Sequence, residues 1–206
     1  HLQIEATKLA FADVYRYVAD PSGMTVTPQQ MLDPLYLEHR AKLIDRKRAR
    51  EFGGGNPVKG GTIYLSAADE RGMMVSFIQS NYMGFGSGVV VPGFGISMQN
   101  RGCGFSLDEA SPNVVAPRKR PFHTIIPAFL TRDGAPVMSF GVMGGHMQPQ
   151  GHVQTLLRML LWQQNPQTAC DAPRWRANEG LSVNLEDHLP AATKAALAAR
   201  GHRIAE

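Results

Sequence analysis

The chain has 206 residues, 43% of them hydrophobic and 18% charged, so it can bury a core of its own as one compact domain. This composition excludes a disordered chain and a small scaffold that depends on disulfides. The formal net charge of +4 gathers in two short clusters without interleaved aromatic residues, which favours charged, solvated loops over a nucleic-acid groove: Arg46, Lys47, Arg48 and Arg50, and Arg118, Lys119 and Arg120.

Cysteine content and hydropathy say little about where the protein works. Cys103 and Cys170 allow at most one disulfide and match neither a metal pair nor a redox motif. The apolar stretches are short and interrupted, so no membrane span is predicted. Because the first residue is His1 and the opening run has helical periodicity, we expect the chain to start inside a larger gene product. The compartment stays open, with the cytoplasm slightly favoured over the periplasm or secretion.

The first quarter of the chain is predicted to be helical. Residues 1–18 form a helix that ends at a cluster of turn formers, residues 20–23. A second helix is predicted over residues 28–48, with Thr27 as its cap and with Pro34 able to split it. Residues 51–61 contain five closely spaced glycines and a proline in the stretch from Gly53 to Gly60, which predicts an exposed linker.

The rest of the chain alternates strands with helices. Two antiparallel strands are expected at 62–69 and 73–80, and two more at 124–131 and 136–142. Between these pairs lies a glycine-rich stretch, 84–104, with a short strand at 89–91. A helix with an apolar stripe, a strand and a last helix ended by Gly201 follow, at 152–163, 181–185 and 190–200. This order predicts an α+β fold with helices outside a largely antiparallel sheet.

The junction Gly61-Thr62 is the most informative place in the sequence, because a glycine linker meets a strand at a threonine. A threonine that begins a strand is usually structural. If the bond before Thr62 is cut, however, the new chain end holds a hydroxyl beside a free α-amine of pKa about 7.7 to 8.0, which can take the hydroxyl proton. Gly61 helps the cut, because a residue without Cβ reaches the strained geometry that attack on its carbonyl requires.

Other patterns are weaker. Gly144 and Gly145 follow an apolar strand and can present two adjacent N–H groups to an oxyanion, although a tight turn explains them equally well. His146 and His152 are six residues apart and have no carboxylate nearby in sequence, so no metal is predicted. The glycines of residues 84–88 precede a strand signal rather than a helix, which disfavours dinucleotide binding and leaves no cofactor implied.

Several short blocks together resemble the gamma-glutamyltranspeptidases, in the same order and with similar spacing. The similarity extends to the amino-terminal part, which resembles the end of that family's large subunit. The blocks are Glu5-Ala6 through Asp13, Asp20-Pro21, Gly61 to Ser66 with Asp69 and Gly72, Phe85 to Gly88, Lys119 to Pro121, Gly141 to Gly145, and Asp171 to Arg174.

The resemblance implies a partial αββα four-layer sandwich of the N-terminal-nucleophile hydrolase type, matured by autocleavage before Thr62. Residues 1–61 would be the end of the large subunit plus linker, and residues 62–206 a small catalytic subunit truncated at its C-terminus. Thr62 would be nucleophile and base, Ser80 would match a threonine that bonds its amine, and Gly144 with Gly145 would form the oxyanion hole. Asn100 matches an asparagine on the substrate side.

The donor site departs from the family pattern. Arg101 and Gly104 stand where a glutamine and an aspartate commonly hold the donor's α-amino group, and Tyr82 stands where an asparagine is usual. His123 and Thr124 replace a serine pair that binds the α-carboxylate. Loss of the carboxylate partner removes a contact worth roughly 1.5 to 3 kcal/mol. Arg101 can instead attract a carboxylate, or can be structural.

The resulting hypothesis is an enzyme that forms an acyl intermediate on Thr62 from a gamma-glutamyl or related amide and passes it to water or an amine. The expected partners are this donor and acceptor, the rest of its large subunit and possibly a second copy, with no nucleic acid. One alternative is a glutaryl or cephalosporin-type acylase of the same fold. Another is a non-catalytic relative that keeps the sandwich as a binding module.

Overall fold

The computed structural model describes residues 1–52 and 61–205, in which the chain forms two compact units that interleave along the sequence. Most of the predicted glycine linker, residues 53–60, lies outside the described residues. Unit 1 comprises His1–Pro57, Gly104–Phe122 and Pro173–Glu206, and unit 2 comprises Val58–Cys103 and His123–Ala172. Each unit is described by itself.

Unit 1 begins with α1, Leu2–Tyr17, which confirms the first predicted helix. A short turn of 3-10 helix, η1 (Pro21–Gly23), follows it. The second predicted helix is split at Pro34 into α2, Pro28–Met31, and α3, Pro34–Ala41. Thr27 and Gln30 form a reciprocal capping box at the start of α2.

The second helical segment ends at Ala41, and the prediction that it continues to Arg48 was wrong. Tertiary contacts hold the following residues in another conformation. The Asp45 carboxylate accepts hydrogen bonds from the backbone N–H groups of Lys47 and Arg48, and Ala49 N–H donates to the Arg200 carbonyl at 2.6 Å. The basic cluster at 46–50 is therefore an anchored loop and not a helix face.

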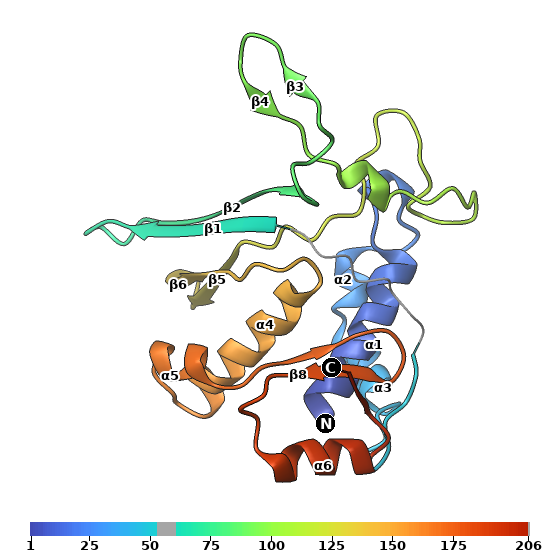
Figure 1. Cartoon of the computed structure of the whole chain (residues 1–206), viewed down its shortest axis with the longest axis vertical. Helices are drawn as coiled ribbons and strands as arrows, with labels where there is room; N and C mark the ends of the chain where they lie inside the picture. The colour runs from blue at the N-terminus through green and yellow to red at the C-terminus, as the bar shows by residue number, and fades with distance from the viewer. Residues whose placement is uncertain (53–60, 206) are drawn as a thin grey trace. The chain divides into compact units, whose positions relative to one another are not determined.

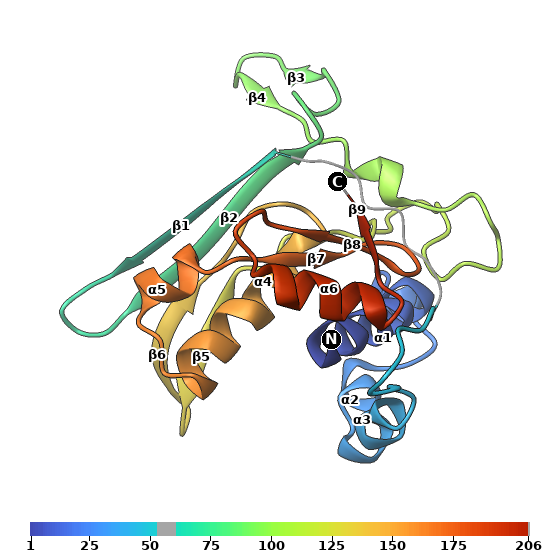
Figure 2. The same ribbon diagram turned by 60° about the horizontal axis from the view of Figure 1, so that its bottom comes forward.

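A three-stranded sheet completes unit 1, with β7 (Trp175–Ala177) antiparallel to β8 (Ser182–Leu185), which is parallel to β9 (Arg203–Ala205). Between β8 and β9 the chain forms α6, Ala191–Ala199 (Figure 2). Sequence periodicity missed β7 and β9, because three residues are too few to show an alternating pattern. The core of this unit consists of Ile4, Ala177, Val183 and Leu197.

A buried ion pair ties α1 to the segment before the linker. Lys8 Nζ lies 2.6 Å from Glu5 Oε1 and also donates to the Arg50 carbonyl, while Arg50 N–H donates to Glu5 Oε2 at 3.0 Å. Both charged side chains are almost fully buried. Because each ion is paired and also bonded to backbone, the cluster avoids leaving an unpaired buried charge and fixes residue 50 against α1.

Unit 2 is built on two antiparallel hairpins, which confirms the four predicted strands with shifts at their ends. The first joins β1 (Gly61–Ala68) to β2 (Met74–Tyr82), and the second joins β5 (Ala128–Arg132) to β6 (Ala135–Phe140). At the first turn, Asp69 Oδ1 accepts the N–H groups of Arg71 and Met73, and Gly72 supplies a φ of +82°.

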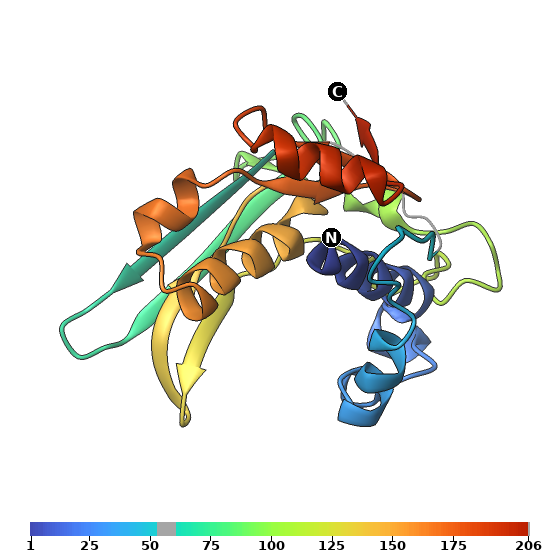
Figure 3. The same ribbon diagram turned by 90° about the horizontal axis from the view of Figure 1, so that it is seen from below.

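The helices of unit 2 follow the second hairpin. They are α4 (Met147–Leu156), a π-helical turn η3 (Leu157–Leu161) and α5 (Pro166–Asp171), which sequence analysis missed although Asn165 caps it and Pro166 begins it. The first hairpin, the second hairpin and α4 lie in successive layers (Figures 1 and 3). Gly141 permits the close approach of the hairpins, since a Cβ there would lie 2.4 Å from the Tyr64 ring.

Helix α4 differs from its prediction in both extent and orientation. It begins at Met147 instead of residue 152, and its buried face is polar: Gln148, Gln150, His152 and Gln154. The side chains of the predicted apolar stripe at Val153, Leu160 and Leu161 are exposed. Hydrogen bonds explain the polar face, because Gln148 Oε1 accepts from Ile126 N–H, and Gln150 and Gln154 donate to helix carbonyls.

A small hairpin and a helical turn lie beyond the end of β2. The hairpin pairs β3 (Val90–Val91) with β4 (Ile96–Ser97), of which only β3 was predicted, and the turn η2 spans Arg101–Gly104. Gly86 lets the chain pass close to the hairpin, because it has a φ of +79° and a Cβ there would lie 2.3 Å from the Met98 carbonyl oxygen. Among the described helices, none combines the length and apolar character needed to cross a membrane.

Candidate active site

Thr62 lies at an irregular end of the β1–β2 hairpin. Gly61 pairs with Tyr82 and Ile63 with Gln79, so one more residue separates the partners on β2 than on β1. This bulge places Ser80 and the following residue opposite Thr62. Bulges of this kind re-aim side chains and are common beside active sites. The Gly61–Thr62 peptide bond therefore lies where the ladder is already interrupted.

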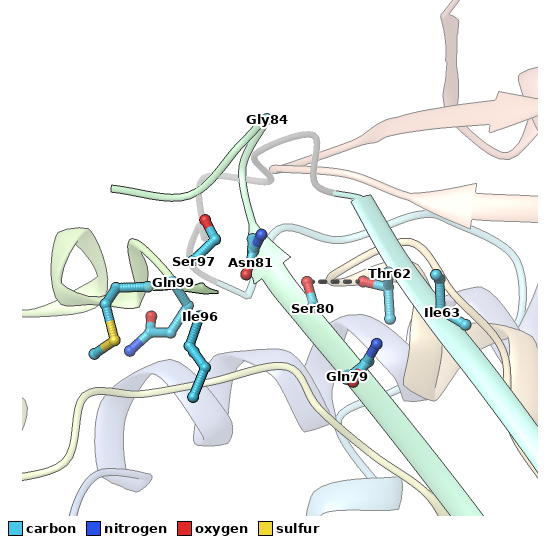
Figure 4. A pocket seen from close by; sticks show the side chains of 10 residues that line it. Thr62, Ile63, Gln79, Ser80, Asn81, Gly84, Ile96, Ser97 and Gln99 are labelled. Atoms are coloured by element: carbon cyan, nitrogen blue, oxygen red, sulfur yellow. Dashed lines mark hydrogen bonds between the residues drawn. The ribbon is translucent and has the colours of Figure 1, made fainter. Parts of the chain in front are cut away.

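A chain of hydrogen bonds begins at the Thr62 side chain. Thr62 Oγ1 donates to Ser80 Oγ at 3.3 Å, and the same oxygen accepts the Tyr82 N–H at 2.8 Å (Figure 4). The sequence prediction gave Ser80 a bond to the amine of the nucleophile, and the structure places the serine against the hydroxyl of the same residue. Ser80 thus links the candidate nucleophile to the backbone of Tyr82.

Thr62 and Ser80 contribute to the wall of a pocket of about 730 Å³ within unit 2. Ten residues from β1, β2 and the region of β4 line it (Figure 4). They are Thr62, Ile63, Gln79, Ser80, Asn81, Gly84, Ile96, Ser97, Met98 and Gln99. Sequence analysis had singled out only two of these as site residues, and the hairpin that supplies the far wall carried no motif that could have revealed it.

Asn100 holds the loop that follows β2. Its amide oxygen accepts the Met83 N–H at 3.0 Å, and its amide nitrogen donates to the carbonyls of Met83 and Gly86. With these three bonds the side chain shapes the rim next to the pocket-lining residue Gly84. Its direct contact with substrate stays a prediction.

Tyr82, Arg101 and Thr124 form a second cluster in unit 2. The Arg101 guanidinium carbon lies 4.7 Å from the centre of the Tyr82 ring, and Arg101 NH1 donates to Thr124 Oγ1 at 3.4 Å. Arg101 is only 7% exposed and Thr124 only 5%. Burial lowers the pKa of Arg101, and burial followed by the neighbouring Cys103 raises the pKa of Tyr82, so the ring stays neutral beneath the cation.

The remaining predicted site residues lie close to this cluster in sequence or at the start of α4. His123 Nδ1 accepts the Ile125 N–H at 3.2 Å, which fixes its ring against its own backbone. Gly144 and Gly145 have φ values of +119° and +57°, and their carbonyls accept from Met147 and Gln148. Their N–H groups lie at the positive end of α4. Within the described residues no hydrogen bond joins either glycine to Thr62, so the oxyanion hole stays a prediction.

One cluster in the described chain has the residue types of a metal site. Ligand atoms of His1, Glu5 and His202 in unit 1 all lie within 4.8 Å of one another. Lys8 already neutralises Glu5 at 2.6 Å, which opposes binding of a cation. Burial and then the Lys8 charge lower the pKa of His202 to about 4, so the imidazole is neutral at pH 7 and can share a proton with His1 Nδ1 at 2.9 Å.

Replacing Ser80 by alanine should slow the reaction more than it destabilises the fold. The substitution removes the acceptor for the Thr62 hydroxyl and one of the supports of Tyr82. We expect kcat of the mature enzyme to fall roughly tenfold, the value of one hydrogen bond of about 1.4 kcal/mol. Steady-state kinetics measure this loss, and Ser80→Thr, which keeps the hydroxyl, is the matched control and should recover most of it. Equal rates in all three proteins would contradict this role.

Comparison with known proteins identifies the family. The model of the family described as Gamma-glutamyltranspeptidase matches residues 1–206, so the chain belongs to this family. Its mixed α/β fold superposes on the crystal structure of cephalosporin acylase from Bacillus halodurans with a TM-score of 0.90 and 52% identity, over 98% of this chain and 37% of that one.

Two curated relatives have different specificities in their names. The oxamate amidohydrolase proenzyme of Klebsiella pneumoniae is 40% identical over 99% of this chain and 39% of its own length. The glutathione hydrolase-like YwrD proenzyme of Bacillus subtilis is 39% identical over 85% of this chain and 33% of its own length. The chain thus spans well under half the length of these relatives.

Proposed function

We propose that this chain contributes the catalytic centre of an N-terminal-threonine amidohydrolase that is made as a proenzyme and cut between Gly61 and Thr62. The carrying observation is the position of Thr62, which follows a glycine at a bulged strand end, bonds Ser80 and lines a pocket. In this proposal residues 1–61 end the large subunit and residues 62–206 belong to the small one. The description of both curated relatives as proenzymes supports it.

Maturation starts with the side chain that later performs catalysis. Thr62 Oγ1 loses its proton and attacks the Gly61 carbonyl carbon, the Gly61–Thr62 C–N bond breaks, and the nitrogen takes a proton to become the α-amine. Water then hydrolyses the resulting ester, which frees the carboxylate of Gly61 and restores the Thr62 hydroxyl. Ser80 is placed to hold this hydroxyl, because their oxygens are 3.3 Å apart.

Turnover repeats the same chemistry on an external amide. The α-amine of Thr62 accepts the hydroxyl proton, Oγ1 attacks the donor carbonyl, and the proton passes to the departing amine as the C–N bond breaks. Water or a second amine then takes the acyl group from Oγ1. The N–H groups of Gly144 and Gly145, held by left-handed backbone at the start of α4, are proposed to stabilise the oxyanion.

The donor is a gamma-glutamyl amide such as glutathione or a related acyl amide. A second candidate, a glutaryl or cephalosporin-type acylase, is favoured by Arg101 and by the backbone at Gly104. A Cβ at Gly104 would lie 3.0 Å from the Phe122 carbonyl oxygen, which leaves little room for the usual aspartate. The names of an oxamate amidohydrolase and a cephalosporin acylase among the similar proteins also favour donors other than glutathione.

The two donors can be separated with matched anilides. Cleaved full-length protein is assayed with gamma-glutamyl-p-nitroanilide and with glutaryl-p-nitroanilide, which differ only in the α-amine. A higher kcat/KM for the glutaryl compound supports the acylase, and the reverse order supports the gamma-glutamyl enzyme. Cleaved protein that binds such compounds without hydrolysing any amide would refute the proposed function and favour a binding module.

The complete fold is proposed to be the four-layer αββα sandwich. Side chains on one face of the first hairpin, Ile63, Leu65, Val75 and Phe77, are about half exposed or more in the described chain. Cross-strand pairing of Leu65 with Phe77 and of Ala67 with Val75 makes this face continuous. Apolar faces of this kind are covered in stable proteins, and the rest of the large subunit is the proposed cover.

A further inference from the structure

Arg101 is a buried cation whose positive charge no side chain of the described residues neutralises. It makes no ion pair there, its single printed side-chain hydrogen bond goes to the neutral Thr124 hydroxyl at 3.4 Å, and its NH2 group is buried without a hydrogen-bond partner. An uncompensated buried charge is costly, so such a group is normally paired with an anion. The Tyr82 ring, 4.7 Å away, offers only the weaker attraction of its π face.

The backbone holds this cation in place. Tyr82 has a φ of +73°, a left-handed conformation that costs a bulky residue about 1 to 3 kcal/mol and persists only when its surroundings enforce it. The Ser80 hydroxyl accepts the Tyr82 N–H, and the Arg101 N–H donates to the Gln99 side chain. Both ends of the stacked pair are therefore fixed from residues that line the pocket.

The cluster is directly connected to the candidate nucleophile. Tyr82 is the cross-strand partner of Gly61, the residue on the other side of the bond that is cut. Hydrogen bonds run from Thr62 to Ser80 and from Ser80 to Tyr82, and the ring of Tyr82 stacks on Arg101. A charge one strand away from the nucleophile is suited to bind the far end of a short acyl group.

We propose that Arg101, stacked on Tyr82 and bonded to Thr124, binds a carboxylate on the acyl group of the donor. The substrate class is then the monoamide of a dicarboxylic acid, with the amide carbonyl at Thr62 and the free carboxylate at Arg101. This inference rests on the proposed function of Thr62 and narrows its donor. A planar guanidinium suits such a ligand, because it can present two parallel N–H groups to the two oxygens.

Paired donors test the inference in the cleaved full-length enzyme. Glutaryl-p-nitroanilide is compared with valeryl-p-nitroanilide, which has a chain of the same length without the carboxylate. We expect kcat/KM to favour the glutaryl donor by roughly 10- to 150-fold, the value of a hydrogen bond to a charged group. In Arg101→Gln this preference should fall to about one while kcat/KM for the valeryl donor changes little.

Two controls separate the role of Arg101 from general effects. Arg71→Gln removes one positive charge from the exposed turn of the same unit and should keep the preference. Tyr82→Phe keeps the stacked ring and should also keep it. Thermal unfolding of Arg101→Gln with and without glutarate provides a binding measurement that does not depend on turnover, and glutarate should raise the melting temperature of the parent protein only.

The outcomes distinguish this inference from the function on which it rests. Protein that hydrolyses neither anilide contradicts the proposed function itself. Protein that hydrolyses both equally well, or whose preference survives in Arg101→Gln, keeps the function and overturns the carboxylate site. An Arg101→Gln variant that loses both activities and its stability together would show that Arg101 pairs with an acidic group of the protein, which also overturns it.

Discussion

Thr62→Ala should leave the full-length protein as a single uncut chain without activity toward any amide. The substitution removes the only atom that performs both steps of the proposed chemistry, the attack on the Gly61 carbonyl and the attack on the donor. Loss of a nucleophile costs on the order of 10⁴ to 10⁶ in kcat, which here means activity below detection. Denaturing gel electrophoresis measures the cut, and release of p-nitroaniline measures the turnover.

Thr62→Ser is the matched control for this result. It keeps a hydroxyl that can donate to Ser80 as Thr62 Oγ1 does at 3.3 Å, and it loses only the methyl group. We expect it to be cut and active, more slowly than the parent. A Thr62→Ala protein that is still cut at the same bond, or that still turns over an amide, would refute the assignment of the nucleophile.

Gly144→Ala should lower kcat roughly 100-fold in the fraction of enzyme that still matures, the usual cost of disturbing one oxyanion donor. Gly144 has a φ of +119°, and a Cβ there would lie 3.2 Å from Met147 Cβ in the first turn of α4. Alanine must therefore move the backbone that carries the two N–H groups. Steady-state kinetics should show the loss in kcat with KM nearly unchanged, because the donors act on the transition state.

Backbone strain alone must be separated from this effect. Gly134 has a φ of +81° in the turn between β5 and β6, with open space around its Cα. Gly134→Ala should destabilise the protein by an amount similar to Gly144→Ala, about 1 to 3 kcal/mol, and leave kcat unchanged. If both variants lost the same fraction of activity, the oxyanion role of Gly144 would be untenable.

The local features of the fold could be predicted because they are written in short stretches of sequence. Turn formers at residues 70–72 and 132–134 predicted both long hairpins, and the threonine and proline at 27 and 28 predicted a helix start. Pro34 divides the second helical segment as expected, since its ring cannot follow a helical turn. Family blocks around Thr62 predicted the site at which the hairpin is bulged.

Features that depend on distant contacts could not be predicted. The basic segment after Ala41 looks helical in sequence, but bonds to Arg200 and Glu5 hold it as a loop. The polar face of α4 is buried because Gln148 satisfies a backbone N–H of another segment, whereas periodicity assigned the apolar stripe to the core. The stacking of Arg101 on Tyr82 brings together residues that sequence analysis had noted only as separate departures.

The central claim, that the chain is cut to expose Thr62 as nucleophile and base, is tested most directly by intact-mass analysis and amino-terminal sequencing of the active full-length protein. The account predicts two chains, of which the smaller begins with Thr-Ile-Tyr-Leu, and a single uncut chain for Thr62→Ala. Active protein in which the Gly61–Thr62 bond remains intact would contradict it.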